Sequence, residues 1–508
     1  MRQSKEIKLL DGEYWWGGIA ADGYRMPMGD EELHRDLRTD QFSNQTAPFL
    51  VSNKGRYIYG FDPFSYTFQN RVLTVESEQE VAVGEGYGTL RGAYRAAAEK
   101  YFPACGRIPG ELLFTAPQYN AWIEMMYEPT GDKMAAYANA ILENGMPAGV
   151  IMIDDNWQED YGVWEFHAGR FPEPKKTVDT LHQLGFPVML WVCNYISPDS
   201  YTFRELEKLG YLIKTKAGDS AIVHWWNGYS GILDLTNPGA VAWLKGRLDG
   251  LMETYGIDGF KFDAGDPDVF ADDFVTHRPT SGTEYCKLWA QFGEQYAFNE
   301  YRACYDMGGR ALGQRLCDKR HSWDEVNGVA SLVPNGLAQG IMGYAYSCPD
   351  MIGGGEFSCF LDNPDLDEDL IVRHAQCAAL FPMMQFSVSP WRILDKEHLS
   401  CCVEVAKLHK ELGGEILQLA HEAAKTGEPV MRYMEYVFPH CGYEKITDQF
   451  MLGDNILVAP VVTPDTDKRA VVFPAGAWRG ACGTIEGPCT KELPAPIDTL
   501  LWFRRLGN

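Results

Sequence analysis

Short apolar runs alternate with segments of helical periodicity through the middle of the chain, and this alternation constrains the fold more than any other feature. It begins after residues 108–110, which read Ile-Pro-Gly, and it predicts β/α units built around one parallel sheet. Predicted strands cover residues 119–125, 149–154, 187–193, 259–263, 312–317, 341–346 and 380–386. Predicted helices cover residues 132–144, 176–184, 238–255, 285–305 and 367–378.

The number of units favours a closed barrel over an open sheet. Seven or eight β/α units in about 300 residues fit a (β/α)₈ TIM barrel. An open, doubly wound sheet would more often carry a Gly-rich phosphate turn, and no Gly-x-Gly-x-x-Gly follows a predicted strand. The predicted fold class is therefore α/β, with the barrel as the central domain.

The sequence on either side of the barrel is rich in β-type patterns. Residues 1–105 contain short alternating runs broken by turn residues, and from about residue 425 the alternation of helix and strand stops. We predict an N-terminal β-sandwich over residues 1–108, a catalytic barrel over 109–420 and a C-terminal β-sandwich over 421–508.

Composition excludes several classes of function. The chain has 45 Lys and Arg against 70 Asp and Glu, a net charge of −25, which would repel phosphate backbones and anionic lipid heads. We therefore expect neither nucleic acid nor membrane as a partner, and we expect no metal or other cofactor. The 13 scattered cysteines form no Cys-x-x-Cys pair, and the N-terminus has no apolar leader, so we expect reduced thiols in a cytoplasmic protein. A homo-oligomer is left open.

Three predicted strands end in carboxylates, and this is where TIM barrels place their reacting groups. Asp154 and Asp155 end the first of these strands, Asp263 ends the second and Asp318 ends the third. Lys261 lies two residues before Asp263, so both side chains should point from one face of the strand into the barrel mouth. The competing interpretation is that Asp154 or Asp155 simply caps the segment that follows.

The order of these motifs resembles glycoside hydrolase family 31. The nucleophile strand of that family is similar to residues 256–266, and its acid/base segment is similar to Arg315-x-x-Asp318 followed by Trp323. The resemblance implies a retaining, exo-acting α-glycosidase with Asp263 as nucleophile and Asp318 as acid/base catalyst. Further matches extend it over about residues 117–465 and lie at residues 171–174, 349–354, 427–432 and 449–460.

A narrower resemblance concerns the substrate. Residues 224–228, 233–238 and 261–265 resemble the branch of the family that holds the myogenesis-regulating glycosidase and its bacterial relatives, which the family context implies are α-galactosidases. Family α-glucosidases usually carry a sugar-binding His after the seventh strand, where this chain has Ser387. An oligosaccharide or small α-glycoside with a terminal α-galactose is the expected substrate, with α-glucosidase, or a non-catalytic carbohydrate-binding barrel, as the alternatives.

Retaining hydrolysis needs one ionised and one protonated carboxylate, about 5–5.5 Å apart. Lys261 should favour the ionised form of Asp263, whereas like charge and burial beside Trp323 should favour the protonated form of Asp318. Trp225 and Trp226 are either flat platforms for a sugar or parts of the core. The predicted substrate-binding residues are Asp154, Asp155, Trp191, Trp225, Trp226, Lys261, Arg315, Trp323 and Asp350.

Overall fold

The computed structural model describes residues 2–361 and 366–507, and a parallel sheet of eight strands lies at its centre. Two hydrogen bonds join the edges of this sheet, from Ile352 N to Gln385 O (2.9 Å) and from Met383 N to Ser347 O (3.1 Å), so it curves into a barrel. In spatial order the strands are β19 (Ser347–Cys348), β18 (Gly313–Arg315), β16 (Phe298–Tyr301), β15 (Gly259–Phe262), β11 (Val188–Val192), β10 (Val150–Ile153), β9 (Gln118–Asn120) and β20 (Gln385–Phe386).

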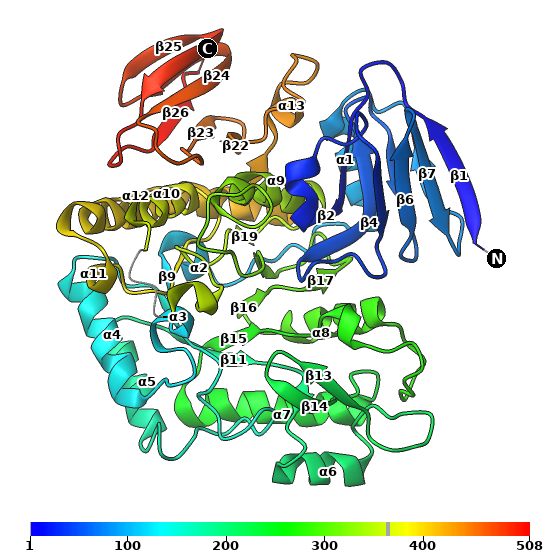
Figure 1. Ribbon diagram of the computed structural model, residues 1–508, viewed down its shortest axis with the longest axis vertical. Helices are drawn as coiled ribbons and strands as arrows, with labels where there is room; N and C mark the ends of the chain where they lie inside the picture. Colours follow the sequence, from blue (N-terminus) through cyan, green and yellow to red (C-terminus); the bar gives the residue numbers. More distant parts are fainter. Residues whose placement is uncertain (1, 362–365, 508) are drawn as a thin grey trace.

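Helices surround the barrel strands, and the sequence fixes several of their ends (Figure 1). The helices are α4 (Gly131–Glu143), α5 (Pro174–Gln183), α7 (Pro238–Tyr255), α8 (Gly282–Gly293), α9 (Leu332–Ile341), α10 (Glu368–Ala378) and α12 (Lys396–Thr426). Thr130 and Asp395 accept backbone N–H bonds as the N-caps of α4 and α12. Gly256, at φ 82°, ends α7 in the left-handed conformation.

Four elements differ from the prediction, one of which is the strand predicted over residues 380–386, where only Gln385–Phe386 form a strand. The predicted strand over residues 119–125 stops at Asn120 and gives way to the short helix α3 (Trp122–Met125), and the predicted helix over 285–305 ends at Gly293, before strand β16. The predicted strand over 341–346 is wrong, since α9 occupies the preceding residues and the strand begins only at Ser347. Every residue of α9 is buried, so the helix has no polar face from which its period could be read.

β-rich regions precede and follow the barrel in sequence, and in Figure 1 the N-terminal one lies at the upper right and the C-terminal one at the upper left. The N-terminal region has two sheets: one orders β1 (Gln3–Lys8), β7 (Val72–Ser77), β6 (Ser65–Gln69) and β3 (Leu33–Asp36), and the other orders β17 (Cys304–Tyr305), β4 (Gln45–Ser52), β5 (Tyr57–Tyr59) and β8 (Ala82–Gly84), with β2 (Trp15–Ile19) also on β4. The C-terminal sheet orders β21 (Met431–Arg432), β22 (Phe450–Leu452), β23 (Ile456–Ala459), β26 (Leu501–Arg505), β24 (Lys468–Gly480) and β25 (Gly483–Pro494).

The C-terminal sheet has a core of its own, in which Phe473, Trp478 and Phe503 are buried. Helix α12 runs between this sheet and the barrel (Figure 1), and Glu415 on α12 forms an ion pair with Arg504 on β26 (2.7 Å). The fold class is thus the predicted one, a TIM barrel with β-rich regions before and after it, whereas the domain limits 1–108, 109–420 and 421–508 stay a prediction.

The N-terminal region is joined to the barrel by backbone pairing. Strand β17, which follows barrel strand β16, pairs in parallel with β4, so that Cys304 lies opposite Gln45. The Gln45 side chain donates to the carbonyl oxygens of Arg302 (2.6 Å) and Arg315 (2.8 Å), which lie at the ends of two barrel strands. The N-terminal region is therefore attached at the carboxyl ends of the strands, where catalytic groups are expected.

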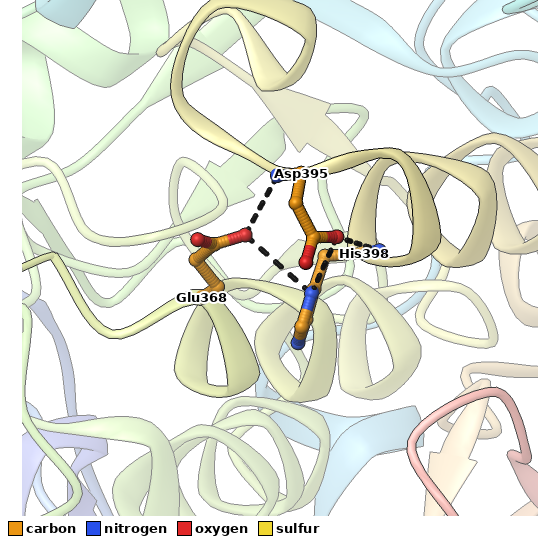
Figure 2. A group of neighbouring side chains, drawn as sticks. All are labelled: Glu368, Asp395 and His398. Carbon is orange, nitrogen blue, oxygen red and sulfur yellow. Dashed lines mark hydrogen bonds and ion pairs between the residues drawn. The ribbon is translucent and has the colours of Figure 1, made fainter.

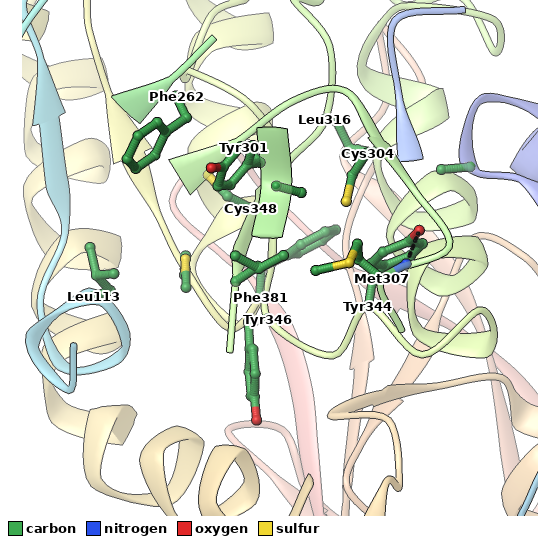
Figure 3. Packing of buried hydrophobic residues seen from close by; sticks show 14 of the residues in the cluster. Leu113, Phe262, Tyr301, Cys304, Met307, Leu316, Tyr344, Tyr346, Cys348 and Phe381 are labelled. Atoms are coloured by element: carbon green, nitrogen blue, oxygen red, sulfur yellow. Dashed lines mark hydrogen bonds between the residues drawn. The ribbon is translucent and has the colours of Figure 1, made fainter. Parts of the chain in front are cut away.

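Alternation along β15 sorts its side chains between core and barrel interior. Phe262 points outward, where its ring stacks on Tyr301 (5.0 Å) and meets Trp289 of α8 (5.2 Å), whereas Lys261 and Asp263 face the interior. Figure 3 shows this buried packing, which continues to Phe381. None of the helices in the described ranges is both long enough and apolar enough to span a lipid bilayer.

The spacing of the barrel strands gives a first test. A Cβ atom at Gly259 of β15 would lie 2.0 Å from the carbonyl oxygen of Phe298 on β16, whereas one at Gly246 of α7 would meet nothing within 4 Å. We expect Gly259→Ala to lower the midpoint of unfolding or to prevent folding. Gly246→Ala should instead raise the free energy of unfolding by about 0.5–1 kcal/mol, since alanine favours helices. Denaturant unfolding followed by circular dichroism measures both, and equal midpoints would contradict the close approach.

Candidate active site

A cavity of about 490 Å³ opens at the carboxyl ends of the barrel strands, a size common for small-molecule sites. Its floor and walls combine carboxylates, two cations and several aromatic rings, and two lining residues come from the N-terminal region. The lining residues are Phe42, Ser43, Trp122, Tyr127, Asp154, Asp155, Trp191, Trp226, Lys261, Asp263, Arg302, Cys317, Asp318, Glu356 and Phe357.

Most of the predicted site residues meet in this cavity. Those that line it are Asp154, Asp155, Trp191, Trp226, Lys261, Asp263 and Asp318. Arg315, Asp350, Trp225 and Trp323 do not line it, and the first two are fully buried. Strands far apart in sequence thus bring together the carboxylates that the strand-end rule selected.

Asp263 is held by three donors at the end of β15. Its carboxylate accepts from Trp191 Nε1 (3.0 Å), from Arg302 Nε (3.1 Å) and from Ala264 N (2.9 Å). Burial by itself would raise the pKa of Asp263, but Arg302, followed by Lys261 and Arg315, holds that pKa well below its usual range. This carboxylate is therefore ionised at neutral pH.

Arg302 is the residue in contact with Asp263 that the sequence interpretation missed. Its guanidinium bonds to both oxygens of Asp266 (2.9 and 2.7 Å), touches Asp263, and lies 5.4 Å from the centre of the Trp226 ring. We assigned residues 285–305 to one helix, whereas Arg302 directly follows strand β16. The short run Phe298–Tyr301, followed directly by this arginine, was the signal that could have found it.

Lys261 acts mainly on another carboxylate than the one expected. Its Nζ lies 2.7 Å from Asp154 Oδ2, and both side chains are buried. Asp154 also accepts from Asp155 N (2.9 Å), so it is held from two sides. The cation bonded to Asp263 is Arg302, and Lys261 lowers the pKa of Asp263 only through its charge.

Asp155 occupies an unusual position. Its φ is 23°, and its two oxygens accept from Tyr161 Oη (2.7 Å) and from Asn227 Nδ2 (2.9 Å). Burial raises the pKa of Asp155 to about 7, with a further contribution from the charge of Asp154, so the carboxyl can donate or accept a hydrogen bond near neutral pH. Neither aspartate caps a helix, since the next one, α5, begins only at Pro174.

A hairpin supplies one wall of the cavity. It consists of β13 (Ile222–Trp225) and β14 (Gly228–Ile232). Trp226 at its tip is 51% exposed, and the neighbouring Asn227 forms hydrogen bonds with Asp155 and with Tyr127 Oη (3.1 Å). Trp225 points away from the cavity, with its Nε1 on Ser230 Oγ (3.0 Å) and its ring against Tyr161. Trp225 therefore belongs to the core and Trp226 to the cavity, a distinction that the sequence left open.

Arg315 and Asp350 support Asp318 from below. Arg315 Nη1 donates to Asp318 Oδ1 (2.7 Å) and to Asp350 Oδ1 (2.6 Å), and its Nε lies 3.3 Å from Glu300 Oε1. The Asp318 side chain itself is 40% exposed toward the cavity side, unlike the buried Asp263. Trp323 donates to Asp367 Oδ2 (2.8 Å) and does not line the cavity, and Asp318 is less buried than we expected.

A second group of ionisable side chains lies outside the cavity lining (Figure 2). Glu368, Asp395 and His398 bring ligand-type atoms within 4.8 Å of one another. His398 Nδ1 lies 2.9 Å from Asp395 Oδ1, Asp395 N donates to Glu368 Oε2 (2.7 Å), and Asp395 caps α12. These bonds tie the starts of α10 and α12 together, and helix capping accounts for the group.

Comparison with known proteins agrees with this geometry. Residues 117–396 match the TIM-barrel domain of glycosyl hydrolases family 31, and residues 427–508 match the C-terminal domain of the same family. The mouse myogenesis-regulating glycosidase is 31% identical over 447 residues, which cover 85% of this chain and 62% of the mouse protein. The chain therefore belongs to glycoside hydrolase family 31, as its motifs predicted.

Other relatives show how widely the fold is used. The α-xylosidase XylQ of Lactiplantibacillus pentosus is 26% identical over 464 residues, or 85% of this chain and 58% of that protein, so the chain spans less than two thirds of either curated relative. A Flavobacterium johnsoniae dextranase complexed with glucose matches with a TM-score of 0.85 at 19% identity, covering all of this chain and 67% of that one. A soil-metagenome α-xylosidase complexed with xylose matches with a TM-score of 0.86 at 19% identity, covering 99% and 79%. These two structures confirm the fold.

The Arg302–Asp263 pair predicts a shift in pH dependence. If Asp263 must be ionised, activity disappears as the pH falls through its pKa, and removing the cation raises that pKa. We expect Arg302→Met to move the acidic limb of kcat/KM upward by about one to three pH units. Arg302→Lys keeps the charge and should move it less.

The control is Arg310→Met, because Arg310 pairs with Glu294 (2.7 Å) outside the cavity lining. It should leave the limb in place. A pH–rate profile with an unchanged acidic limb in Arg302→Met would contradict the role of this cation.

Proposed function

We propose that the chain is a retaining, exo-acting α-glycosidase that cleaves terminal α-galactosides. The observation that carries this proposal is the pair of carboxylates in one cavity with unequal surroundings. Asp263 is buried among cations, whereas Asp318 is half exposed and has one oxygen on Arg315. Such a difference suits one group to act as nucleophile and the other as acid and base.

In this mechanism Asp263 attacks the anomeric carbon while Asp318 gives a proton to the glycosidic oxygen, and the aglycone leaves. The sugar is then bound to Asp263 as an ester. Asp318, now ionised, takes a proton from water, which attacks the same carbon and releases the sugar with its original configuration. Trp191 and Arg302 orient the attacking carboxylate, and the buried Asp154, Asp155 and Lys261 close the inner end of the cavity, which favours a terminal residue.

The charges in the cavity favour a neutral sugar. Both lining cations are already paired, Lys261 with Asp154 and Arg302 with Asp263 and Asp266. A sugar that carries a carboxylate or a sulfonate needs a cation that is not already used by a protein carboxylate. A neutral pyranose, by contrast, can exchange hydrogen bonds with Asp154, Asp155 and Lys261.

Two observations support galactose over glucose. Asp155 can accept or donate a hydrogen bond near neutral pH and lies beside Asp154, so the pair suits an axial hydroxyl and its neighbour. Ser387 is buried and its Oγ accepts from Ile123 N (2.7 Å), so the position where family α-glucosidases usually carry His does not line the cavity. The second candidate is an α-glucosidase, because the α-glucosidase 2 of Bacillus thermoamyloliquefaciens is 24% identical over 444 residues, which cover 81% of this chain and 54% of that protein.

The cytoplasm is the location that we propose for this protein. Buried thiols such as Cys193, Cys286 and Cys402 fit a reducing compartment.

The catalytic pair can be tested with matched variants. We expect Asp263→Asn to lower turnover by several orders of magnitude on every substrate, since the covalent step is lost. Asp318→Asn should damage disaccharide cleavage far more than cleavage of a dinitrophenyl glycoside, whose leaving group needs little protonation, and azide should partly restore its deglycosylation. Steady-state kinetics measures each effect. Near-normal activity of Asp263→Asn, or equal losses in Asp318→Asn without azide rescue, would assign the roles elsewhere.

Specificity is tested with a panel of nitrophenyl α-galactoside, α-glucoside and α-xyloside. A hydrogen bond made to the axial hydroxyl and unmade with the equatorial one costs about 1.5–3 kcal/mol, so kcat/KM for the α-galactoside should be at least about tenfold higher. NMR should show α-galactose as the first product, and a chelator should leave the rate unchanged. A preference for the α-glucoside would move the proposal to the second candidate, and a β-configured first product would exclude retention.

A further inference from the structure

A second cavity, of about 680 Å³, lies apart from the catalytic one and is also of a size common for small-molecule sites. It is lined by α3, α4, the 3₁₀ helix η4 (Phe357–Phe360) and α11 (Pro390–Ile393), and α3, α4 and α11 lie on the same side of the molecule in Figure 1. None of the described residues that line this second cavity also lines the catalytic cavity.

The two cavities nevertheless share a wall, which residues 122–127 form. Trp122 and Tyr127 line the catalytic cavity, whereas Ile123, between them, lines the second cavity. The same division occurs in η4, whose first residue lines the catalytic cavity and whose last residue lines the second. A ligand in the second cavity would therefore touch the back of a segment whose front faces the catalytic groups.

Tyr127 connects this wall to one of the catalytic-cavity acids. Its Oη donates to Asn227 Oδ1 (3.1 Å), and Asn227 Nδ2 in turn donates to Asp155 Oδ2 (2.9 Å). The carbonyl oxygen of Tyr127 also accepts from Asn156 Nδ2 (3.3 Å). A displacement of residues 122–127 would thus be transmitted to Asp155 through hydrogen bonds.

The charged side chains of the second cavity balance one another. Glu124 accepts from Arg392 Nε (3.0 Å) and Nη2 (2.9 Å), and Lys133 Nζ lies 3.5 Å from Glu128 Oε2. A charged ligand would need an opposite charge that is not already paired. A neutral ligand rich in hydroxyl groups can instead exchange hydrogen bonds with both pairs, and Arg392 Nη1 donates to none of the described residues.

An indole ring supplies a flat apolar surface in the same cavity. Trp391 of α11 is half-buried, and its ring centre lies 5.7 Å from that of Tyr137 on α4. Tyr137 is buried, and its Oη donates to Ser387 O (3.0 Å), so the ring that backs Trp391 is itself held in place. Such a surface suits the C–H face of a pyranose.

We propose that the second cavity is an effector site that binds a neutral sugar and acts on the catalytic cavity through residues 122–127. A flat aromatic surface beside balanced polar pairs matches a ring that has an apolar face and a rim of hydroxyl groups. Linkage requires that a sugar bound in one cavity changes the affinity of the other by the same factor as the reverse. Binding in the second cavity is independent of the proposed function, whereas its effect on turnover presupposes that function.

Binding is tested by fluorine NMR on protein labelled with fluorotryptophan. The Trp391 resonance is identified by its absence from Trp391→Phe, and galactose, glucose and xylose are the probes. At least one of them should shift this resonance in a saturable manner, whereas the resonance of Trp243, which lines neither cavity, should stay in place. No shift of the Trp391 resonance with any of the three sugars would overturn the inference.

A matched pair of variants on α4 places the sugar. Ala136 lines the second cavity, so Ala136→Leu should fill it and weaken binding at least about tenfold. The neighbouring Ala135 lines neither cavity, and Ala135→Leu should leave the affinity within about twofold of the wild type. Equal thermal unfolding midpoints confirm that both variants are folded. Unchanged affinity in Ala136→Leu would overturn the site, and tighter binding of galacturonate than of galactose would overturn the preference for a neutral ligand.

The effector role is tested by steady-state kinetics with the bound sugar added. Its effect on the wild type should depart from simple competition, because it occupies two cavities, and should become purely competitive in Ala136→Leu. Simple competition in both proteins would overturn the effector role. If the wild type cleaves no α-glycoside, the proposed function fails, whereas the fluorine titration still decides whether the second cavity binds a sugar.

Discussion

Buried ionic groups at the strand ends are the constraint on which the rest of the structure depends. Lys261, Arg302 and Arg315 are all buried, and each is paired with at least one carboxylate. A buried charge without a partner is strongly unfavourable, so these three cations fix the positions of the carboxylates around them. Asp263 therefore stays ionised and Asp318 is anchored by one oxygen, which gives the two groups different chemistry within one cavity.

The same pairs link separate parts of the molecule. Arg302 donates both to the Asp263 carboxylate and to the carbonyl oxygen of Ser43. Gln45, the first residue of β4, donates to the carbonyl oxygens of Arg302 and Arg315. The N-terminal sheets thus do more than cover the buried helix α9. Phe42 and Ser43 of the N-terminal region form part of the cavity wall. A shift of this region would move the Ser43 carbonyl oxygen that accepts from Arg302.

Local strain concentrates where the site requires it. Asp155, Ala264 and Asp350 have positive φ values of 23°, 60° and 85°, and all three lie at or beside the ends of barrel strands. Left-handed residues with side chains cost stability, and the surrounding structure must compensate for them. Here the compensation comes from hydrogen bonds, such as those from Lys319 N (2.7 Å) and Gly355 N (2.9 Å) to Asp350. The unfavourable backbone conformations therefore lie at the strand ends, where the cavity side chains must be held in fixed orientations.

Sequence by itself determined the barrel class and the carboxylates Asp154, Asp155, Asp263 and Asp318, because strand periodicity and strand-end position are local properties of the chain. The family followed from the resemblance of its motifs. It could not separate Trp225 from Trp226, because only the packing of the hairpin decides which of two adjacent side chains faces the core and which faces the cavity. Arg302 was hidden because the predicted helix was continued through Gly293, where α8 ends, and over the four-residue strand β16. The pairing of Lys261 with Asp154, and the approach of Phe42 from about 220 residues away in sequence, were decided by tertiary structure alone, since contacts between distant segments leave no periodic trace in a single sequence.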